Sequence, residues 1–267
     1  LRFNNGKVIS SLQIKNCHLV SRRTILNAIK IAMWSGPRNI STALMRSFEN
    51  RNDTFVSDEP FYAHFLKQTG VDHPMRDEVI KSGISNWTTV SDYLTNTIPD
   101  GKSVWYQKHM AQHNLPGVDL GWAEKVFNCF LIRDPKEVIL SYTKKYEITS
   151  IYQLGFPQQF DLFSQLREKK GVPPIVLDSK DILIDPESTL KKLCHTLGIP
   201  FTDKMLKWPK GRRNSDGIWG KYWYNTVEQS TSFQAYQKKN EEMPVEYTAI
   251  YEESTELYLK LHNHRIQ

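Results

Sequence analysis

Long hydrophobic runs and abundant cysteine are both missing from this chain of 267 residues. No apolar stretch approaches the roughly 18 residues that a membrane span needs, so we expect no membrane partner. The three cysteines, Cys17, Cys129 and Cys194, cannot all pair with one another. The last two fall in apolar segments, where free thiols pack as small hydrophobic groups. The sequence therefore favours a reducing compartment, which we take to be the cytoplasm.

Internal repeats and low-complexity linkers are also absent. A chain of this length buries a sizeable core, and we expect a single domain covering residues 1–267. Residues 1–25 carry no clear pattern and are expected to form an N-terminal extension. The start at Leu1 suggests that an initiator or a leader was removed. The soluble part of a membrane-anchored luminal protein is the alternative to a cytoplasmic one.

The chain further lacks a continuous basic tract and a cluster of metal ligands. The net charge is +6, but the basic residues occur as scattered pairs, and no zinc-finger or RNA-recognition signature is present. We therefore expect no nucleic-acid partner. The eight histidines are dispersed, and a pair at helical spacing, such as His109 and His113, is more often structural than metal-binding. No metal is expected.

The most informative segment present is Trp34-Ser-Gly-Pro-Arg-Asn-Ile-Ser-Thr42, which follows an apolar run. Its Gly-Pro pair predicts a tight turn, after which unpaired backbone N–H groups open a helix. One arginine and two hydroxyl residues add further donors, as in a phosphate site. The nucleotide-hydrolase loop G-x-x-x-x-G-K-[ST] has a second glycine and a lysine, and both are missing here. The expected anion is phosphate-like but differs from the terminal phosphate of ATP, and simple helix capping is the alternative.

A second candidate phosphate site lies about a hundred residues later. An apolar run over residues 125–132 predicts a buried parallel strand, and Arg133 follows at its carboxyl end, where open α/β sheets bind ligands. Asp134 is predicted to cap the next helix, with Glu137 at the capping-box position. Ser141 lies two turns into that helix, beside a guanidinium that can hold a phosphate through two parallel hydrogen bonds. The alternative is that Arg133 pairs with an internal carboxylate and Ser141 only lies on a helix surface.

These two motifs, in this order and with a serine eight residues after the arginine, resemble the sulfotransferase superfamily. In that family they hold the two ends of 3′-phosphoadenosine 5′-phosphosulfate. The resemblance implies that Arg133 and Ser141 hold the 3′-phosphate, about one adenosine's length from the early loop. A donor with two phosphate groups and a sulfate also explains the positive net charge as well as nucleic acid would. Arg38 stands where many relatives have lysine, which keeps the charge. The early-loop residues implied in donor binding are Gly36, Pro37, Arg38, Asn39, Ile40, Ser41 and Thr42.

Two later segments extend the resemblance. Residues 176–199 are similar to the family's late strand and helix, and their pattern alone predicts a helix that is capped by Asp185 and ended by Gly198. Lys210-Gly-Arg-Arg213 resembles a loop that closes over the 3′-phosphate, and a solvated basic turn is the alternative. We expect residues 205–235 to cover the cofactor and the acceptor. The residues of the basic loop implied in donor binding are Lys210, Gly211 and Arg212.

The expected fold is a three-layer α/β/α arrangement with a central, mainly parallel five-stranded sheet and a P-loop-like phosphosulfate loop. A terminal helix is expected over residues 244–262. The strands are expected near residues 29–34, 54–57, 103–107, 125–132 and 174–178.

Sulfuryl transfer needs an in-line acceptor, a base for its proton and cations around the transferring group. Glu59, after the second strand, matches the place of a catalytic glutamate in some branches of the family. The alternative is that Asp58 or Glu59 caps a helix starting at Pro60. His109 follows the third strand near the place of the cytosolic branch's histidine base, but one position early. We rank Glu59 first and His109 second. Lys108 is the candidate cation for the sulfuryl group and Arg38 for the leaving oxygen.

The expected acceptor is a small molecule with a hydroxyl or an amine, and the sequence does not indicate an oligomeric state. Asp58, Glu59 and Asp216 would suit a cationic acceptor such as an alkaloid natural product. A phosphate-loop nucleotide kinase or hydrolase and a non-catalytic nucleotide-binding module are the competing functions. Aromatic residues that are candidates for an acceptor wall, with core packing as the alternative, are Phe61, Trp87, Trp105, Trp219, Tyr222, Trp223 and Tyr224.

Overall fold

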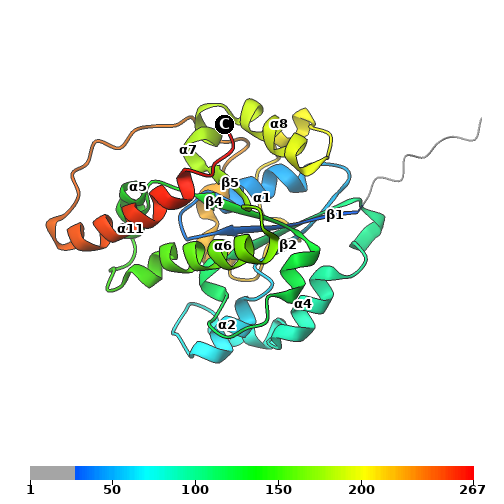
Figure 1. Cartoon of the computed structure of the whole chain (residues 1–267), viewed down its shortest axis with the longest axis horizontal. Coiled ribbons are helices and arrows are strands. Elements are labelled where there is room, and N and C mark those ends of the chain that lie inside the picture. The colour runs from blue at the N-terminus through cyan, green and yellow to red at the C-terminus, as the bar shows by residue number, and fades with distance from the viewer. Residues whose placement is uncertain (1–27) are drawn as a thin grey trace, which may run out of the picture.

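A computed structural model describes residues 28–267, so the expected N-terminal extension and Cys17 lie outside the described residues (Figure 1). A five-stranded sheet forms the centre, with the strand order β2-β3-β1-β4-β5 and every neighbouring pair parallel. The five predicted strands are confirmed, and each end differs from its expected position by two residues or fewer except at β3. β3 ends at Met110, three residues beyond its expected end at residue 107. The strands are β1 Ile29–Ser35, β2 Thr54–Asp58, β3 Val104–Met110, β4 Phe127–Ile132 and β5 Ile175–Asp178.

Side chains of each strand alternate between the two faces of the sheet. In β1, Ile31 and Met33 face one hydrophobic layer, whereas Ala32 and Trp34 face the other, and all four are fully buried. A strand that is buried on both faces has a continuous apolar sequence, which is the pattern that predicted this sheet.

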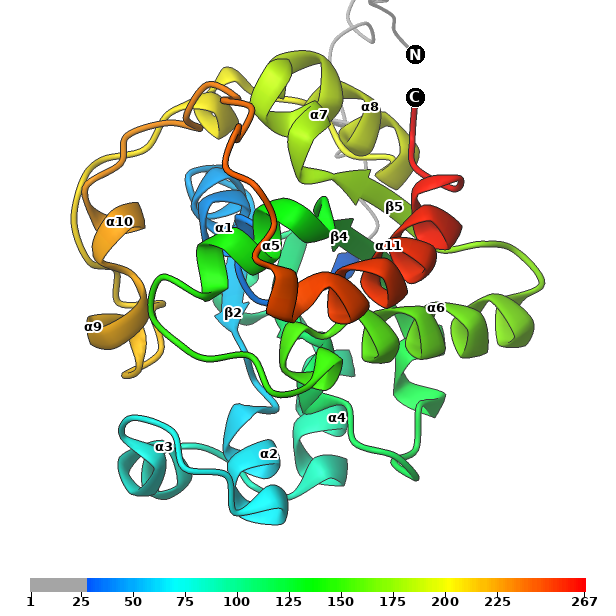
Figure 2. The same cartoon turned by 90° about the vertical axis from the view of Figure 1, so that its left-hand side faces the viewer.

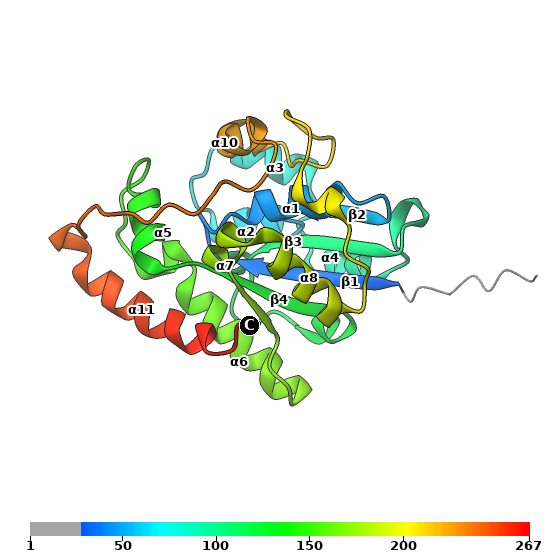
Figure 3. The ribbon, with the colours of Figure 1, turned by 90° about the horizontal axis from the view of Figure 1, so that it is seen from above.

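Helices cover both faces and confirm the three-layer α/β/α fold. Helices α1, α7 and α8 pack on the face of Ile31, and α4 and α6 pack on the face of Trp34 (Figures 2 and 3). None of the described helices is long and apolar enough to cross a membrane. The α-helices are α1 Ser41–Glu49, α2 Tyr62–Thr69, α3 Arg76–Ser82, α4 Trp87–Thr95, α5 Pro135–Tyr142, α6 Phe156–Lys170, α7 Ser179–Ile184, α8 Pro186–Leu197, α9 Gly220–Trp223, α10 Asn225–Glu228 and α11 Thr248–His262.

Short 3-10 turns connect several of these elements. The last of them precedes α11, so the terminal helix begins four residues later than the sequence predicts. Their bounds are Pro99–Gly101, Ala111–His113, Gly121–Lys125, Ile151–Leu154, Asp203–Leu206 and Val245–Tyr247.

The predicted helix caps are largely present. Asp134 accepts hydrogen bonds from the backbone N–H groups of the second and third residues of α5. Asp185 caps α8 in the same way, and Gly198 ends that helix in the left-handed conformation. The reciprocal capping-box bond expected of Glu137 is not formed within the described chain. Its carboxylate turns to Arg133 instead, because a guanidinium is a stronger partner than a backbone N–H.

Replacing Asp185 with alanine should lower the free energy of unfolding by about 1 kcal/mol, because the carboxylate accepts a hydrogen bond from the backbone N–H of Ser188. Urea unfolding measures the change. Lys192→Ala, at an exposed position of the same helix, is the control and should shift stability by less than about 0.5 kcal/mol. Equal losses in the two variants would show that the cap contributes nothing.

Candidate active site

The early loop leaves the carboxyl end of β1 through a strained turn. A Cβ on Gly36 would lie 2.6 Å from the carbonyl oxygen of Leu154, so only glycine fits there. Arg38 and Ile40 have φ angles of 65° and 56°, in the left-handed region that residues with side chains rarely adopt. Strained backbone of this kind is typical of ligand sites.

The start of α1 is open for an anion. Ile40, at the N-cap position, provides no side-chain hydrogen bond, and the backbone N–H groups of residues 39–43 find no acceptor within the described chain. Because the first N–H groups of a helix point outward and carry partial positive charge, this helix start suits a phosphate or a phosphosulfate.

Arg133 and Ser141 contact the early loop directly. The Nη1 of Arg133 donates to the carbonyl oxygen of Arg38 at 2.7 Å, and the Nε of Arg38 donates to the Oγ of Ser141 at 2.9 Å. The two motifs thus share one rim of the sheet, but they touch, whereas the resemblance implied an adenosine's length between them. Arg133 also pairs with the Glu137 carboxylate at 2.9 Å, so the internal ion pair of the alternative is present in the structure.

The predicted basic loop does not join this contact. Lys210 and Arg212 are exposed, and within residues 28–267 neither side chain bonds to the early loop or to Arg133. Gly211 instead donates its N–H to the carbonyl oxygen of Glu228.

A later segment approaches Arg133 instead. Figure 2 shows the chain between α10 and α11 running beside α5. Burial and the neighbouring Glu137 raise the pKa of Tyr236 to about 12, whereas burial and the charges of Lys144 and Arg133 lower the pKa of Lys239. Sequence reasoning missed these residues; the lysine doublets at 144–145 and 238–239 were the available signal.

A buried charge cluster lies at the same sheet edge, on β2 and β3. Lys108 is 1% exposed, and its ammonium donates to Asp58 at 2.9 Å, to Glu59 and to the hydroxyl of Tyr224 at 3.0 Å. Burial alone would lower the pKa of Lys108, but the two carboxylates outweigh that effect and raise it well above its ordinary value. Lys108 is therefore a fixed cation.

Glu59 is the second carboxyl group of the cluster. Burial raises its pKa, Lys108 opposes that rise and the neighbouring Asp58 adds to it. Its backbone is strained, with φ at 44°, and its N–H donates to the carbonyl oxygen of Lys108 at 2.8 Å. The capping alternative for Asp58 or Glu59 is wrong, because α2 begins at Tyr62 without any side-chain cap.

His109 lies in the hydrophobic layer on the other side of β3. Its ring stacks on Trp34 at 4.4 Å between centroids, with Phe61 and Trp122 close by. Burial and then the Lys108 charge lower its pKa to about 3, which makes it a weak base. His113 lies in a 3-10 turn after β3, so it does not share an α-helix with His109. Residues 28–267 contain no group of three candidate metal ligands.

The acidic residues suggested for a cationic acceptor are used internally. Asp216 forms a buried ion pair with Arg46 at 2.6 Å, and Asp58 is bound to Lys108. The candidate aromatic residues have different surroundings. Phe61, Trp87 and Trp105 belong to the hydrophobic core, and Tyr224 belongs to the charge cluster. Trp219 packs edge-on against Tyr62 and donates to the Tyr224 hydroxyl at 3.4 Å, Trp223 packs against Tyr146, and Tyr222 is exposed.

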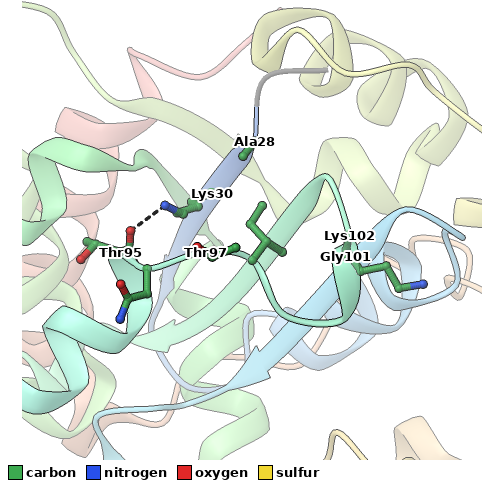
Figure 4. A pocket seen from close by; sticks show the side chains of 8 residues that line it. Ala28, Lys30, Thr95, Thr97, Gly101 and Lys102 are labelled. Atoms are coloured by element: carbon green, nitrogen blue, oxygen red, sulfur yellow. Dashed lines mark hydrogen bonds between the residues drawn. The ribbon is translucent and has the colours of Figure 1, made fainter. Parts of the chain in front are cut away.

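A pocket of about 550 Å³ lies elsewhere, at the amino ends of β1 and β3 (Figure 4). Lys30 bonds there to the carbonyl oxygen of Thr95. Since parallel sheets bind their ligands at the carboxyl ends of strands, this pocket is distinct from the candidate active site.

Comparison with known proteins identifies the family of this chain. The sequence model of the family described as sulfotransferase domain matches residues 29–246. Two Arabidopsis thaliana proteins, branched-chain-amino-acid aminotransferase-like proteins 1 and 2, are 38% and 37% identical to this chain over 235 residues. The match covers 88% of this chain but only 42% and 41% of theirs, so the chain spans about two fifths of those relatives.

The sulfotransferase domain of the Synechococcus PCC 7002 olefin synthase has a similar fold, with a TM-score of 0.54 and 14% identity, over 87% of this chain and 95% of that one. The family match spans all five strands, the early loop, Lys108 and Arg133. The chain therefore belongs to the sulfotransferase domain family.

Proposed function

We propose that this protein transfers a sulfuryl group from 3′-phosphoadenosine 5′-phosphosulfate to a hydroxyl or an amine of a small molecule. One observation carries the proposal. Four neighbouring strands, β2, β3, β1 and β4, bring a buried carboxylate, a fixed cation, an open helix start and a second arginine to the same edge of the sheet.

The donor's 5′-phosphosulfate is proposed to bind at the start of α1, where the free N–H groups and Arg38 supply hydrogen bonds and charge. Its 3′-phosphate is proposed to bind Arg133 and Ser141. The pair with Glu137 uses Nε, and the bond to Arg38 uses one N–H of Nη1. Because a guanidinium has five N–H donors, three remain for the phosphate.

In the proposed reaction, the acceptor oxygen or nitrogen forms a bond to sulfur while the bond from sulfur to the bridging oxygen breaks. The leaving 3′-phosphoadenosine 5′-phosphate keeps the electron pair of that bond. Glu59 takes the acceptor proton, and Lys108 and Arg38 stabilise negative charge on the transferring group and on the leaving oxygen. The raised pKa of Glu59 makes it a better base than an exposed glutamate.

The basic loop and the acceptor contribute less to the proposal. Within the described residues, the side chains of Lys210 and Arg212 do not bond to the early loop or to Arg133, and the Gly211 N–H is bound to Glu228. The internal pairing of Asp58 and Asp216 removes the argument for a cationic acceptor, so the proposed acceptor is defined only by its nucleophilic group.

Ligand-induced stabilisation tests the donor class. The bisphosphate product, at about a hundred times its dissociation constant and without magnesium, should stabilise the protein by about 2.7 kcal/mol and raise Tm by several degrees. Thermal-shift measurements would compare it with magnesium ATP. A larger shift with magnesium ATP would contradict the proposal and favour a nucleotide kinase or hydrolase. Strong binding of the bisphosphate without transfer to any acceptor would favour a non-catalytic module.

Arg133→Ala should weaken binding of the bisphosphate by roughly tenfold to a hundredfold, because charge-assisted hydrogen bonds contribute about 1.5–3 kcal/mol. Isothermal titration calorimetry measures the affinity. Arg167→Ala, which removes an exposed arginine from α6, is the matched control and should bind as the unaltered protein does. Unchanged affinity in Arg133→Ala would remove the 3′-phosphate assignment.

Glu59→Gln should lower kcat by about a hundredfold or more while donor affinity changes little, because the amide cannot accept the proton. In the unaltered enzyme kcat should fall as pH decreases through the raised pKa of Glu59, since only the carboxylate is a base. That acid limb should disappear in Glu59→Gln. His109→Gln should retain the limb. Full turnover by Glu59→Gln, with none by His109→Gln, would reverse the ranking of the two bases.

A further inference from the structure

The buried ammonium of Lys108 has three N–H donors and three acceptors. Two acceptors are the carboxylates of Asp58 and Glu59, from β2 and the residue that follows it. The third is the hydroxyl of Tyr224, from a segment more than a hundred residues away in the chain. A distant segment therefore completes the surroundings of the proposed catalytic groups.

The Tyr224 hydroxyl bridges the cation and one carboxylate. It accepts from Lys108 and donates to Asp58, with distances of 2.7 and 2.9 Å to the two carboxylate oxygens. Burial and the charge of Asp58 keep the pKa of Tyr224 well above its ordinary value, so the phenol retains the proton that it donates.

The segment from Arg213 to Tyr224 is fixed at two further points. The backbone N–H of Gly217 donates to the second oxygen of Asp58 at 3.0 Å. Asp216 accepts the N–H of Arg213 and forms the buried ion pair with Arg46 of α1. Asp58 is thus bound by Lys108 on one side and by this segment on the other.

We propose that Tyr224 is a positioning residue, whose hydroxyl satisfies Asp58 and so leaves Lys108 bound to Glu59, the proposed base. This inference rests on the proposed function. Without the hydroxyl, Asp58 would lose a donor and draw Lys108 toward itself. Glu59 would then face a less compensated negative charge, and its carboxylate would be harder to form.

Several charged or titratable groups face Glu59. Of the three acceptors bound to Lys108, the Tyr224 hydroxyl is the one that can be removed without changing the formal charge. Tyr222 offers a matched control, because it lies in α9 of the same segment, is 49% exposed and has no bond to the cluster. The groups around Glu59 are Lys108 on β3, Asp58 on β2, Tyr62 on α2 and Tyr224 after α9, with neutral His109 and His113 near the Lys108 charge.

The test compares Tyr224→Phe with Tyr222→Phe in two measurements. Carboxyl ¹³C NMR of glutamate-labelled protein, with the Glu59 signal assigned by its loss in Glu59→Gln, gives the pKa of Glu59 directly. We expect that pKa to rise by about 0.5–1 unit in Tyr224→Phe, a threefold to tenfold change in the protonation equilibrium, and to stay unchanged in Tyr222→Phe. The acid limb of kcat should shift to higher pH by the same amount, while the donor KM changes by less than about twofold.

The NMR measurement needs neither donor nor acceptor, so the two proposals can fail separately. An unchanged Glu59 pKa in Tyr224→Phe would overturn the role of Tyr224 and leave the proposed function intact. A raised pKa in a protein that transfers no sulfuryl group would support the positioning role and overturn the proposed function. Circular dichroism of both phenylalanine variants checks that each is folded.

Discussion

The candidate site depends on the ion pairs of the Lys108 ammonium. This ammonium is held between the carboxylates of Asp58 and Glu59, out of contact with water. Burying a charge is costly unless hydrogen bonds and an opposite charge compensate it, and Lys108 has both. Burial raises the pKa of Glu59, the charge of Lys108 opposes that rise, and the neighbouring Asp58 carboxylate adds to it. The same buried cluster therefore contains a carboxyl group with the raised pKa that the proposed base requires.

The parallel sheet explains why these groups meet. In a sheet whose strands all run the same way, every strand ends at one edge, so loops far apart in sequence gather there. Met33 of β1 lies in register with Lys108 of β3, which in turn lies beside Asp58 of β2. The early loop begins three residues after Met33, and Arg133 follows β4 on the other side. The binding elements and the proposed catalytic elements are therefore neighbours by topology.

Local patterns in the sequence predicted the sheet, the α5 and α8 caps and the edge at which Arg133 lies, because each depends on residues close in the chain. They did not predict the partners of Asp58, which lie 50 positions away at Lys108 and 166 positions away at Tyr224. The sequence suggests Tyr224 only as a candidate for an aromatic wall. A tyrosine that fills space and a tyrosine that donates a hydrogen bond look the same in an amino-acid sequence. His109 illustrates the opposite case. Its position after Lys108 resembled a catalytic motif, but strand alternation directs its side chain to the opposite face.

The contacts among Arg38, Arg133 and Ser141 limit what the proposed donor gains on binding. A phosphate that takes the place of the Arg38–Ser141 bond exchanges one hydrogen bond for another, so the net gain at that contact is smaller than a count of new contacts suggests. Glu137 need not be displaced, because it occupies only the Nε of Arg133. It does offset the charge of that arginine, however, and a weakly charged anion would then be held poorly. A dianionic phosphate keeps a stronger attraction to the remaining N–H groups. The Arg133–Glu137 pair thus lowers this attraction without removing it, and the N–H groups of Arg133 that remain still favour a terminal phosphate over a hydroxyl at the same position.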